Sequence, residues 1–318
     1  MQIGFSNEKK VWDTLFEILE IRMQCGEFTV IDATNSKAEE INHYKTFAKT
    51  YRYRILLIDL TDIPIEICKQ RNVAREPLKR VPDETIDKMY ARFQTQKIPS
   101  GIQVIKPKDP CNVTAEDLEP LWMKPIDLSA YKKIVHIGDI HGCYTVLKEY
   151  LGEIKDDVYY IFHGDYLDRG IENAQVLQFL LEIKDKKNIL LLTGNHERVI
   201  NAYAHDKADV SREFEFVTKP QLDAANFDKK ELSRLYSKFA QCAYYDFHDK
   251  RVFACHGGLS HMPENFTLVA SKQMIKGVGK YEDYLAVADS WVKSTDVYQI
   301  FGHRNTKASP IQINDKVF

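Results

Sequence analysis

The segment Ile134-Val-His-Ile-Gly-Asp-Ile-His-Gly142 decides the fold, because an apolar run ends there in a glycine-rich polar turn. The pattern returns four times along the chain, in YYIFHGD (159–165), ILLLTGNHE (189–197), VFACHGG (252–258) and YQIFGH (298–303). Short apolar runs separated by amphipathic stretches are typical of α/β proteins with buried strands. Since the carboxyl ends of strands in open α/β sheets border one crevice, we expect the five turns to surround a single site.

The composition excludes several classes of protein. Of the 318 residues, 44% are hydrophobic and 11% aromatic, which suffices for ordinary cores and excludes wholesale disorder. The 44 basic residues nearly balance the 46 acidic ones, so bulk charge cannot drive binding to a polyanion. The sequence has no run of 18 apolar residues, no signal peptide at its start, and six scattered cysteines without a CxxC pair. These features predict a soluble, cytoplasmic protein with reduced thiols and no membrane partner.

The length favours two domains. In the first, residues 1–97, apolar periodicity predicts helices near 11–23 and 36–50, strands at 28–32 and 54–60, and helices opened by Pro64 and Pro82. The unbroken apolar run at 54–60 predicts a strand buried on both faces. Residues 98–130 are rich in proline and show little periodicity, which predicts a linker. Residues 131–318 form the second domain, where the alternation resumes.

Six side chains in the five turns have the chemistry of metal ligands. They offer carboxylate or amide oxygens and imidazole nitrogens, and they are Asp139, His141, Asp165, Asn195, His256 and His303. This set suits first-row dications, and we expect Mn²⁺ first, with Ni²⁺, Fe²⁺ and Zn²⁺ as alternatives. Six ligands for two ions require one shared group, and a carboxylate such as Asp165 can bridge.

The pair of ions and its neighbours predict phosphoryl chemistry. Two cations about 3.5–4 Å apart hold a phosphoryl oxygen and lower the pKa of a bridging water. The leaving oxygen then requires a proton, which His196, next to Asn195, can supply. Asp168 can hold His196 in the required tautomer, and the Arg169 guanidinium presents a fork of donors to phosphate oxygens.

Each turn taken alone also fits an ordinary junction between a strand and a turn, but five such turns in one chain indicate a shared site. His163 is interpreted as a packed residue, and three other histidines as loop or surface residues: His205, His248 and His261. The segment Gly277-Val-Gly-Lys280 lacks the first glycine and the Ser/Thr of a phosphate-binding loop, which predicts a plain loop.

The order GD-x-HG, GD-x-x-DRG, GNHE, HGG and GH resembles the calcineurin-like metallophosphoesterases, in the branch of phosphoprotein phosphatases and bacterial polynucleotide kinase–phosphatases. The resemblance covers about residues 133–310 and implies an α/β sandwich. It implies that one metal ion is bound by Asp139, His141 and Asp165, and the other by Asp165, Asn195, His256 and His303. It also implies that His196 is the acid, Asp168 its partner and Arg169 the phosphate anchor. The family's second phosphate-binding arginine stays open among Arg198, Arg212, Arg234 and Arg304.

Residues 10–95 resemble the 5′-hydroxyl polynucleotide kinase module of the P-loop kinases. The resemblance rests on VIDATN (30–35), the apolar strand, a helix with R-N-x-x-R (71–75), and R-V-P (80–82). It implies an arginine-bearing lid over ATP, with Arg71, Arg75 and Arg80 as candidates; on charge alone the same stretch fits a solvated helix face. No GxxxxGK[ST] loop is present, so we expect ATP binding only if a longer protein supplies that loop.

The expected fold class is therefore α/β: an incomplete P-loop kinase-like segment followed by a calcineurin-like metallophosphoesterase sandwich. The resemblance implies removal of terminal 3′- or 2′-phosphates from RNA or DNA ends, with an RNA ligase as an expected partner. The same chemistry on phosphoserine or phosphothreonine proteins, or on dinucleoside polyphosphates, stays open. Residues 1–95 alternatively form a non-catalytic binding module. We also expect the chain to be a piece of a longer protein that cannot phosphorylate 5′-hydroxyl ends by itself.

Overall fold

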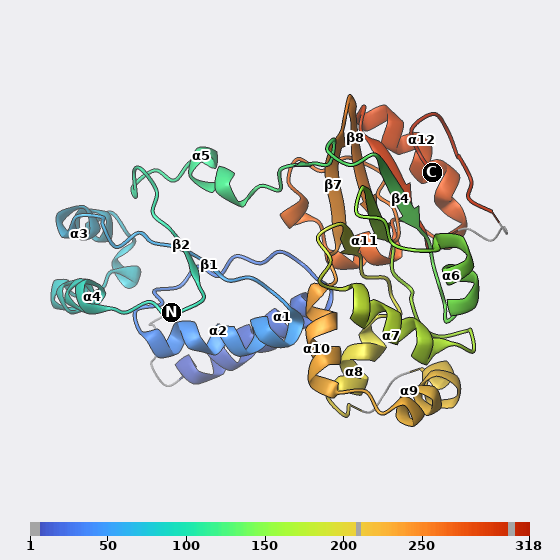
Figure 1. Ribbon diagram of the computed structural model, residues 1–318. Helices are drawn as coiled ribbons and strands as arrows, with labels where there is room; N and C mark the ends of the chain where they lie inside the picture. Colours follow the sequence, from blue (N-terminus) through green and yellow to red (C-terminus); the bar gives the residue numbers. More distant parts are fainter. Residues whose placement is uncertain (1–6, 208–210, 305–308) are drawn as a thin grey trace. The chain divides into compact units, whose positions relative to one another are not determined.

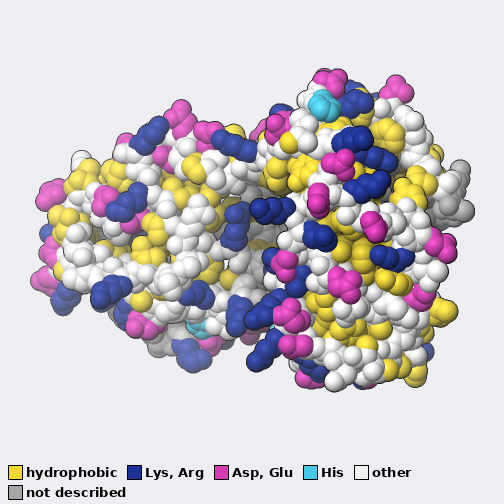
Figure 2. All heavy atoms as spheres, viewed as in Figure 1, with side chains coloured by type: hydrophobic (Ala, Val, Ile, Leu, Met, Phe, Trp, Pro, Cys, Tyr) yellow, Lys and Arg dark blue, Asp and Glu magenta, His cyan; other side chains and the backbone are white. Residues whose placement is uncertain are grey.

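The protein, a computed structural model, is described for residues 7–207, 211–304 and 309–318. Its chain divides into two units, residues 1–122 and 123–318. Figure 2 shows Lys and Arg side chains as well as Asp and Glu side chains on the face that it draws of each unit. Among the described residues, no helix has both the length and the apolar character that crossing a bilayer requires.

The smaller unit consists of helices and a two-stranded parallel sheet (Figure 1). Its elements are α1 (Glu8–Gln24), α2 (Ala38–Tyr51), β1 (Leu56–Ile58), α3 (Ile65–Val73), α4 (Asp83–Thr95), β2 (Gln103–Ile105) and α5 (Ala115–Leu118). Helices α1 and α2 pack through aromatic rings, since Phe16 stacks on His43 and Phe47 with centroids 4.0 and 5.4 Å apart. The four helices expected from periodicity and from Pro64 and Pro82 are confirmed.

Three expectations for this unit differ from the structure. Residues 28–32 form no strand, and the Val30 side chain is 74% exposed, because within residues 7–122 no strand pairs with this run. The run at 54–60 yields only β1, which is not buried on both faces, because a two-stranded sheet leaves apolar side chains such as Ile58 uncovered. Residues 98–130 are more than a linker, because they contain β2, which pairs with β1 in parallel.

The larger unit is an α/β sandwich, as expected (Figure 1). Its strands are β3 (Ile126–Asp127), β4 (Lys133–Ile137), β5 (Val158–Phe162), β6 (Ile189–Leu191), β7 (Cys242–Phe247), β8 (Lys250–Cys255) and β9 (Tyr298–Phe301). Its α-helices are α6 (Tyr144–Leu151), α7 (Asn173–Ile183), α8 (Arg198–Ala204), α9 (Lys219–Ala225), α10 (Lys229–Lys238), α11 (Ser271–Lys276) and α12 (Tyr284–Ser294). A π-helix, η4 (Phe214–Thr218), leads directly into α9.

Two sheets form the centre of the sandwich. One is parallel, in the order β4-β5-β6, and the other is mixed, in the order β3-β7-β8-β9. Every residue of β5 is buried, because Tyr160 and Phe162 pack toward α7 while Tyr159 and Ile161 pack against β7 and β8. Trp291 of α12 and Phe253 of β8 belong to a third cluster on the outer face of the mixed sheet. The unbroken apolar runs of the sequence therefore reflect burial on both faces.

Candidate metal centre

The sandwich brings the five polar turns together. Asp139 and His141 follow β4, Asp165 follows β5, and the remaining candidate ligands, Asn195, His256 and His303, follow β6, β8 and β9. Backbone hydrogen bonds join the turns: the His141 amide donates to the Asp165 carbonyl at 2.9 Å, and the Gly302 amide donates to the His256 carbonyl, also at 2.9 Å. The ends of strands in two different sheets thus border one site.

Asp165 lies at the centre of this site. Two clusters, each with one donor atom per residue and all donor atoms within 4.8 Å of one another, contain it: His141, Asp165 and His196, and Asp165, His256 and His303. Asp165 Oδ2 lies 3.2 Å from His256 Nε2 and 3.7 Å from His141 Nε2. The carboxylate is 1% exposed. Asp165 thus belongs to both clusters that the described residues form.

The histidines are oriented as metal ligands require. His141 Nδ1 donates to the Leu167 carbonyl at 3.0 Å, and His256 Nδ1 donates to the His163 carbonyl at 2.8 Å. A backbone acceptor at Nδ1 turns Nε2 into the site, where it can bind a metal ion once it carries no proton. Among the described residues, the buried Nε2 of His141 has no hydrogen-bond partner. An orphaned imidazole nitrogen beside a carboxylate fits a divalent cation.

The backbone of the site is strained. Five of the ten non-glycine residues described with positive φ are candidate site residues: His141, Asp165, Asp168, Arg169 and His303. Such residues cost about 1–3 kcal/mol each and concentrate at functional sites. Gly194 is required for a related reason, because a Cβ there would collide with Asp165 Oδ1.

Burial and charge set the protonation of the ligands. Burial lowers the pKa of His141 and lowers that of His303 to about 4, so both imidazoles are neutral near pH 7. Burial opposes ionisation of Asp165, yet the hydrogen bond from His256 and the charges of His256 and His196 together hold the pKa of Asp165 well below its usual value. Burial also opposes protonation of His256, but the same pairing raises its pKa to about 9. These shifts favour a carboxylate at the centre of the site at neutral pH.

His196 and Asp168 form a hydrogen-bonded pair beside the two clusters. His196 Nδ1 lies 2.6 Å from Asp168 Oδ2, and Asp168 is fully buried. The His196 amide also donates to Asp165 Oδ1 at 3.0 Å, which fixes its turn against the shared carboxylate. Burial lowers the pKa of His196, but the hydrogen bond that His196 donates to Asp168, together with the negative charges of Asp165, Asp168 and Glu197, raises the pKa above the ordinary value. A protonated imidazole whose Nε2 remains available is suited to act as an acid.

The other expected residues lie nearby. Asp139 belongs to neither of the two clusters found among the described residues. Its Oδ1 accepts a hydrogen bond from the His303 amide at 3.2 Å. Asn195 Oδ1 lies 3.3 Å from His256 Nε2. Arg169 is exposed at φ 64°, one residue after Asp168.

The four candidates for a second phosphate-binding arginine differ in their surroundings. Arg304 is 2% exposed and its Nη2 donates to the Val278 carbonyl at 2.6 Å, so it supports the loop 277–280 from inside. Arg234 is an exposed residue that pairs with Glu231. Arg198 and Arg212 are exposed. The expected packing of His163 is confirmed, since it is 2% exposed and bonded to His136 at 2.7 Å.

No role was predicted for Glu197 from the sequence. It is fully buried, and its carboxylate accepts the backbone amides of Gly194, Asp165 and Tyr166, the latter two at 2.9 Å. It therefore ties the turn after β6 to the turn after β5. The signal for this role was the glutamate that ends Gly194-Asn-His-Glu197, directly before α8, because a buried carboxylate must find hydrogen-bond donors and the amides of the nearby turns supply them.

In the smaller unit, the proposed lid arginines are all exposed, and Arg80 Nε donates to the Arg75 carbonyl at 2.9 Å. Arg71 lies in α3, one residue before the buried Asn72. Asn72 holds the segment by exchanging two hydrogen bonds with the Val81 backbone, at 2.8 and 3.1 Å. This segment is thus ordered, and its charges face solvent.

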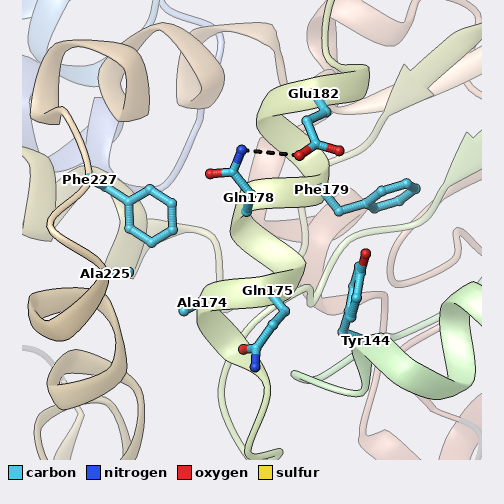
Figure 3. Close-up of a pocket in the computed structure, with 8 residues that line it drawn as sticks. All are labelled: Tyr144, Ala174, Gln175, Gln178, Phe179, Glu182, Ala225 and Phe227. Atoms are coloured by element: carbon cyan, nitrogen blue, oxygen red, sulfur yellow. Dashed lines mark hydrogen bonds between the residues drawn. The ribbon is translucent and has the colours of Figure 1, made fainter.

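A hollow of about 300 Å³ lies elsewhere in the larger unit (Figure 3). Tyr144 and Phe179 line it from α6 and α7, and Phe227 lines it from the connection between α9 and α10. Gln178 donates to Glu182 across one turn of α7 at 3.1 Å. None of its lining residues is a candidate site residue, so the hollow is separate from the metal centre.

Each of the two units matches a known protein family. The family described as calcineurin-like phosphoesterase matches residues 132–316, and the AAA domain family matches residues 3–96. Both families correspond to the resemblance found in the sequence, with an AAA domain as the P-loop-like segment.

Individual relatives are phosphatases. The serine/threonine-protein phosphatase PP2A-like PPG1 of Candida albicans is 27% identical over 227 residues, which cover 66% of this chain and 42% of that protein. The chain thus spans less than half the length of this curated relative. Two solved structures are similar at TM-scores of 0.41 and 0.42: a putative diadenosine tetraphosphatase (16% identity, 60% of this chain and 83% of that one) and a serine/threonine phosphatase from Saccharomyces cerevisiae (15% identity, 61% and 69%).

Proposed function

The chain belongs to the calcineurin-like phosphoesterase family, and from this premise we propose that it is a phosphomonoesterase with two divalent metal ions that acts on the phosphorylated ends of RNA. One observation carries the proposal: Asp165 is common to two clusters of donor atoms and lies against the turn that bears the His196–Asp168 pair. The donor set of imidazoles and carboxylates and the orphaned His141 Nε2 support a pair of cations there.

The ligand roles follow the proposal. His141 and Asp165, with Asp139, would hold one ion, and Asp165, Asn195, His256 and His303 would hold the other. Two such ions, when bound, draw charge from the phosphoryl oxygens and lower the pKa of water. We propose Mn²⁺ as the native metal.

The protein's own residues supply the remaining functions. The exposed guanidinium of Arg169 binds the phosphate oxygens with two parallel hydrogen bonds. As an oxygen of water bonds to phosphorus and the P–O bond of the ester breaks, His196 Nε2 gives its proton to the leaving oxygen. Asp168 accepts the hydrogen bond from His196 Nδ1 and keeps Nε2 turned toward the substrate.

The proposed substrate class rests on the presence of both units in one chain. A P-loop-like segment that precedes the phosphoesterase supports an enzyme that treats nucleic-acid ends, removing a 3′- or 2′-phosphate. A second candidate is dephosphorylation of phosphoserine or phosphothreonine proteins, which the match to a PP2A-like phosphatase favours equally.

Substrate profiling tests the proposal. Purified chain is incubated with 3′-phosphorylated RNA, a phosphoserine peptide and 4-nitrophenyl phosphate, each with Mn²⁺, Ni²⁺ or Mg²⁺. We expect phosphate release from RNA to be the fastest, to require Mn²⁺ or Ni²⁺, and to vanish in Asp165→Asn but not in the exposed control Asp156→Asn. Faster release from the peptide would replace the RNA proposal with the second candidate, and release from none would refute the phosphomonoesterase.

A further inference from the structure

Asp168 is held on both of its carboxylate oxygens. Oδ2 accepts the hydrogen bond from His196 Nδ1 at 2.6 Å. Oδ1 lies 2.5 Å from Thr218 Oγ1, 50 residues further along the chain. Because a carboxylate only accepts, the Thr218 hydroxyl must be the donor. Thr218 and Asp168 are both fully buried, so water does not compete for this contact.

Thr218 ends a short π-helix that is anchored in the core. Phe214 at the start of η4 and Leu222 in α9 are 1% and 0% exposed and belong to the cluster that also contains Leu167, next to Asp168. π-Helical turns are rare and occur frequently at functional sites. The core packing on either side fixes the Thr218 side chain against Asp168.

The η4–α9 segment also fixes the backbone of the turn that contains Asp168. Gln221 Oε1 in α9 accepts the Asn173 amide at 2.8 Å. The Asn173 side chain accepts the Asp168 amide at 2.8 Å and donates to the Gly170 carbonyl at 2.7 Å. Asp168 and Arg169 have φ values of 70° and 64°, which few side chains adopt without such support. The η4–α9 segment thus holds both the side chain and the turn of Asp168.

We propose that Thr218 is a positioning residue for the acid: its hydroxyl orients Asp168, which in turn orients His196. The inference rests on the proposed function in that His196 donates a proton there. Thr218 does not touch the reacting atoms and acts only through Asp168. Removing its hydroxyl leaves a buried carboxylate oxygen without that donor, so Asp168 is free to rotate away from His196.

Isosteric and conservative variants test this role. Thr218→Val removes the hydroxyl at nearly constant volume, Thr218→Ser keeps it, and Thr295→Val removes a hydroxyl that accepts from the Val297 amide outside the site. With Mn²⁺, we expect Thr218→Val to lower kcat on an alkyl phosphate about 10- to 100-fold at unchanged KM, as loss of a supporting contact does. On 4-nitrophenyl phosphate, whose leaving group needs little protonation, we expect Thr218→Val to lower kcat less than about threefold. Thr218→Ser and Thr295→Val retain activity on both substrates.

A second readout does not depend on activity. In ¹⁵N-histidine-labelled protein, the Nδ1 proton of His196 bonded to Asp168 gives a low-field signal, assigned by its loss in His196→Ala. We expect this signal to shift or broaden in Thr218→Val and to persist in Thr218→Ser. An unchanged signal in Thr218→Val, equal kcat losses on both substrates, or a Ser variant as impaired as the Val variant would overturn the proposal. If the wild-type chain hydrolyses neither substrate, the proposed function fails, and the spectra alone decide on Thr218.

Discussion

The pairing of Asp165 with His256 predicts a pH-dependent contribution to stability. The Asp165→Asn substitution keeps the size of the side chain but removes the charge 3.2 Å from His256 Nε2. With Asp165 present, the pKa of His256 is about 9 in the folded protein against an ordinary value of 6.5, and both groups are buried. The variant protein keeps the burial of His256, which disfavours the charged imidazole.

The sign and size follow from this difference. A raised histidine pKa stabilises the fold fully below pH 6.5, and the contribution disappears as the pH rises through 9. At about 1.4 kcal/mol per pH unit, the whole shift is worth about 3 kcal/mol. The charges of Asp139 and Glu197 supply part of the raised pKa of His256 and remain in the variant. We therefore expect the difference in unfolding free energy between wild type and Asp165→Asn to fall by about 2–3 kcal/mol between pH 6.5 and 9.5.

Urea denaturation with excess chelator measures this difference at half-unit steps of pH. The exposed residue Asp156 provides the matched control, and Asp156→Asn should give a curve parallel to wild type. A difference between wild type and Asp165→Asn that stays constant from pH 6.5 to 9.5 would show that Asp165 does not hold the proton on His256.

Two further predictions concern proton donation and phosphate binding. His196→Ala should slow release of basic alkoxide leaving groups about 10²- to 10⁴-fold, and release of 4-nitrophenol far less, because only poor leaving groups need the proton. Equal losses on both substrates would mean that His196 has another role. Arg169→Gln should raise the inhibition constant of inorganic phosphate about 10- to 100-fold, because hydrogen bonds to a charged group are lost. Arg54→Gln, at an exposed position of the smaller unit, should leave that constant unchanged. Competitive inhibition assays measure both constants, and an unchanged constant in Arg169→Gln would exclude Arg169 from phosphate binding.

The larger unit was predictable from its sequence because most of its strands are short apolar runs, of which β5 is buried throughout. Each of the five apolar runs ends directly in a glycine turn, so the runs specify the strands and the turns specify the site. Asp165 and His256 could therefore be placed at one site, although they lie 91 positions apart in the sequence.

The residues that support the site were less predictable. Glu197 and Thr218 act through backbone amides and through Asp168, contacts that depend on how η4 and the turns pack. Thr218 lies in no motif, and its role depends on a π-helix that hydrophobic periodicity does not reveal. In the smaller unit, the run at 28–32 has strand composition, but the described part of that unit offers it no partner strand, and a strand requires a neighbour to satisfy its amides.

Asp165 is proposed to join two cations in one centre. Titration of the chelator-treated chain with Mn²⁺, followed by electron paramagnetic resonance, tests this claim most directly, because two manganese ions that share a carboxylate are magnetically coupled. We predict two ions bound per chain, a coupled spectrum in the wild type and in Asp156→Asn, and loss of the coupled signal in Asp165→Asn. Binding of a single ion with an uncoupled six-line spectrum in the wild type would contradict the account.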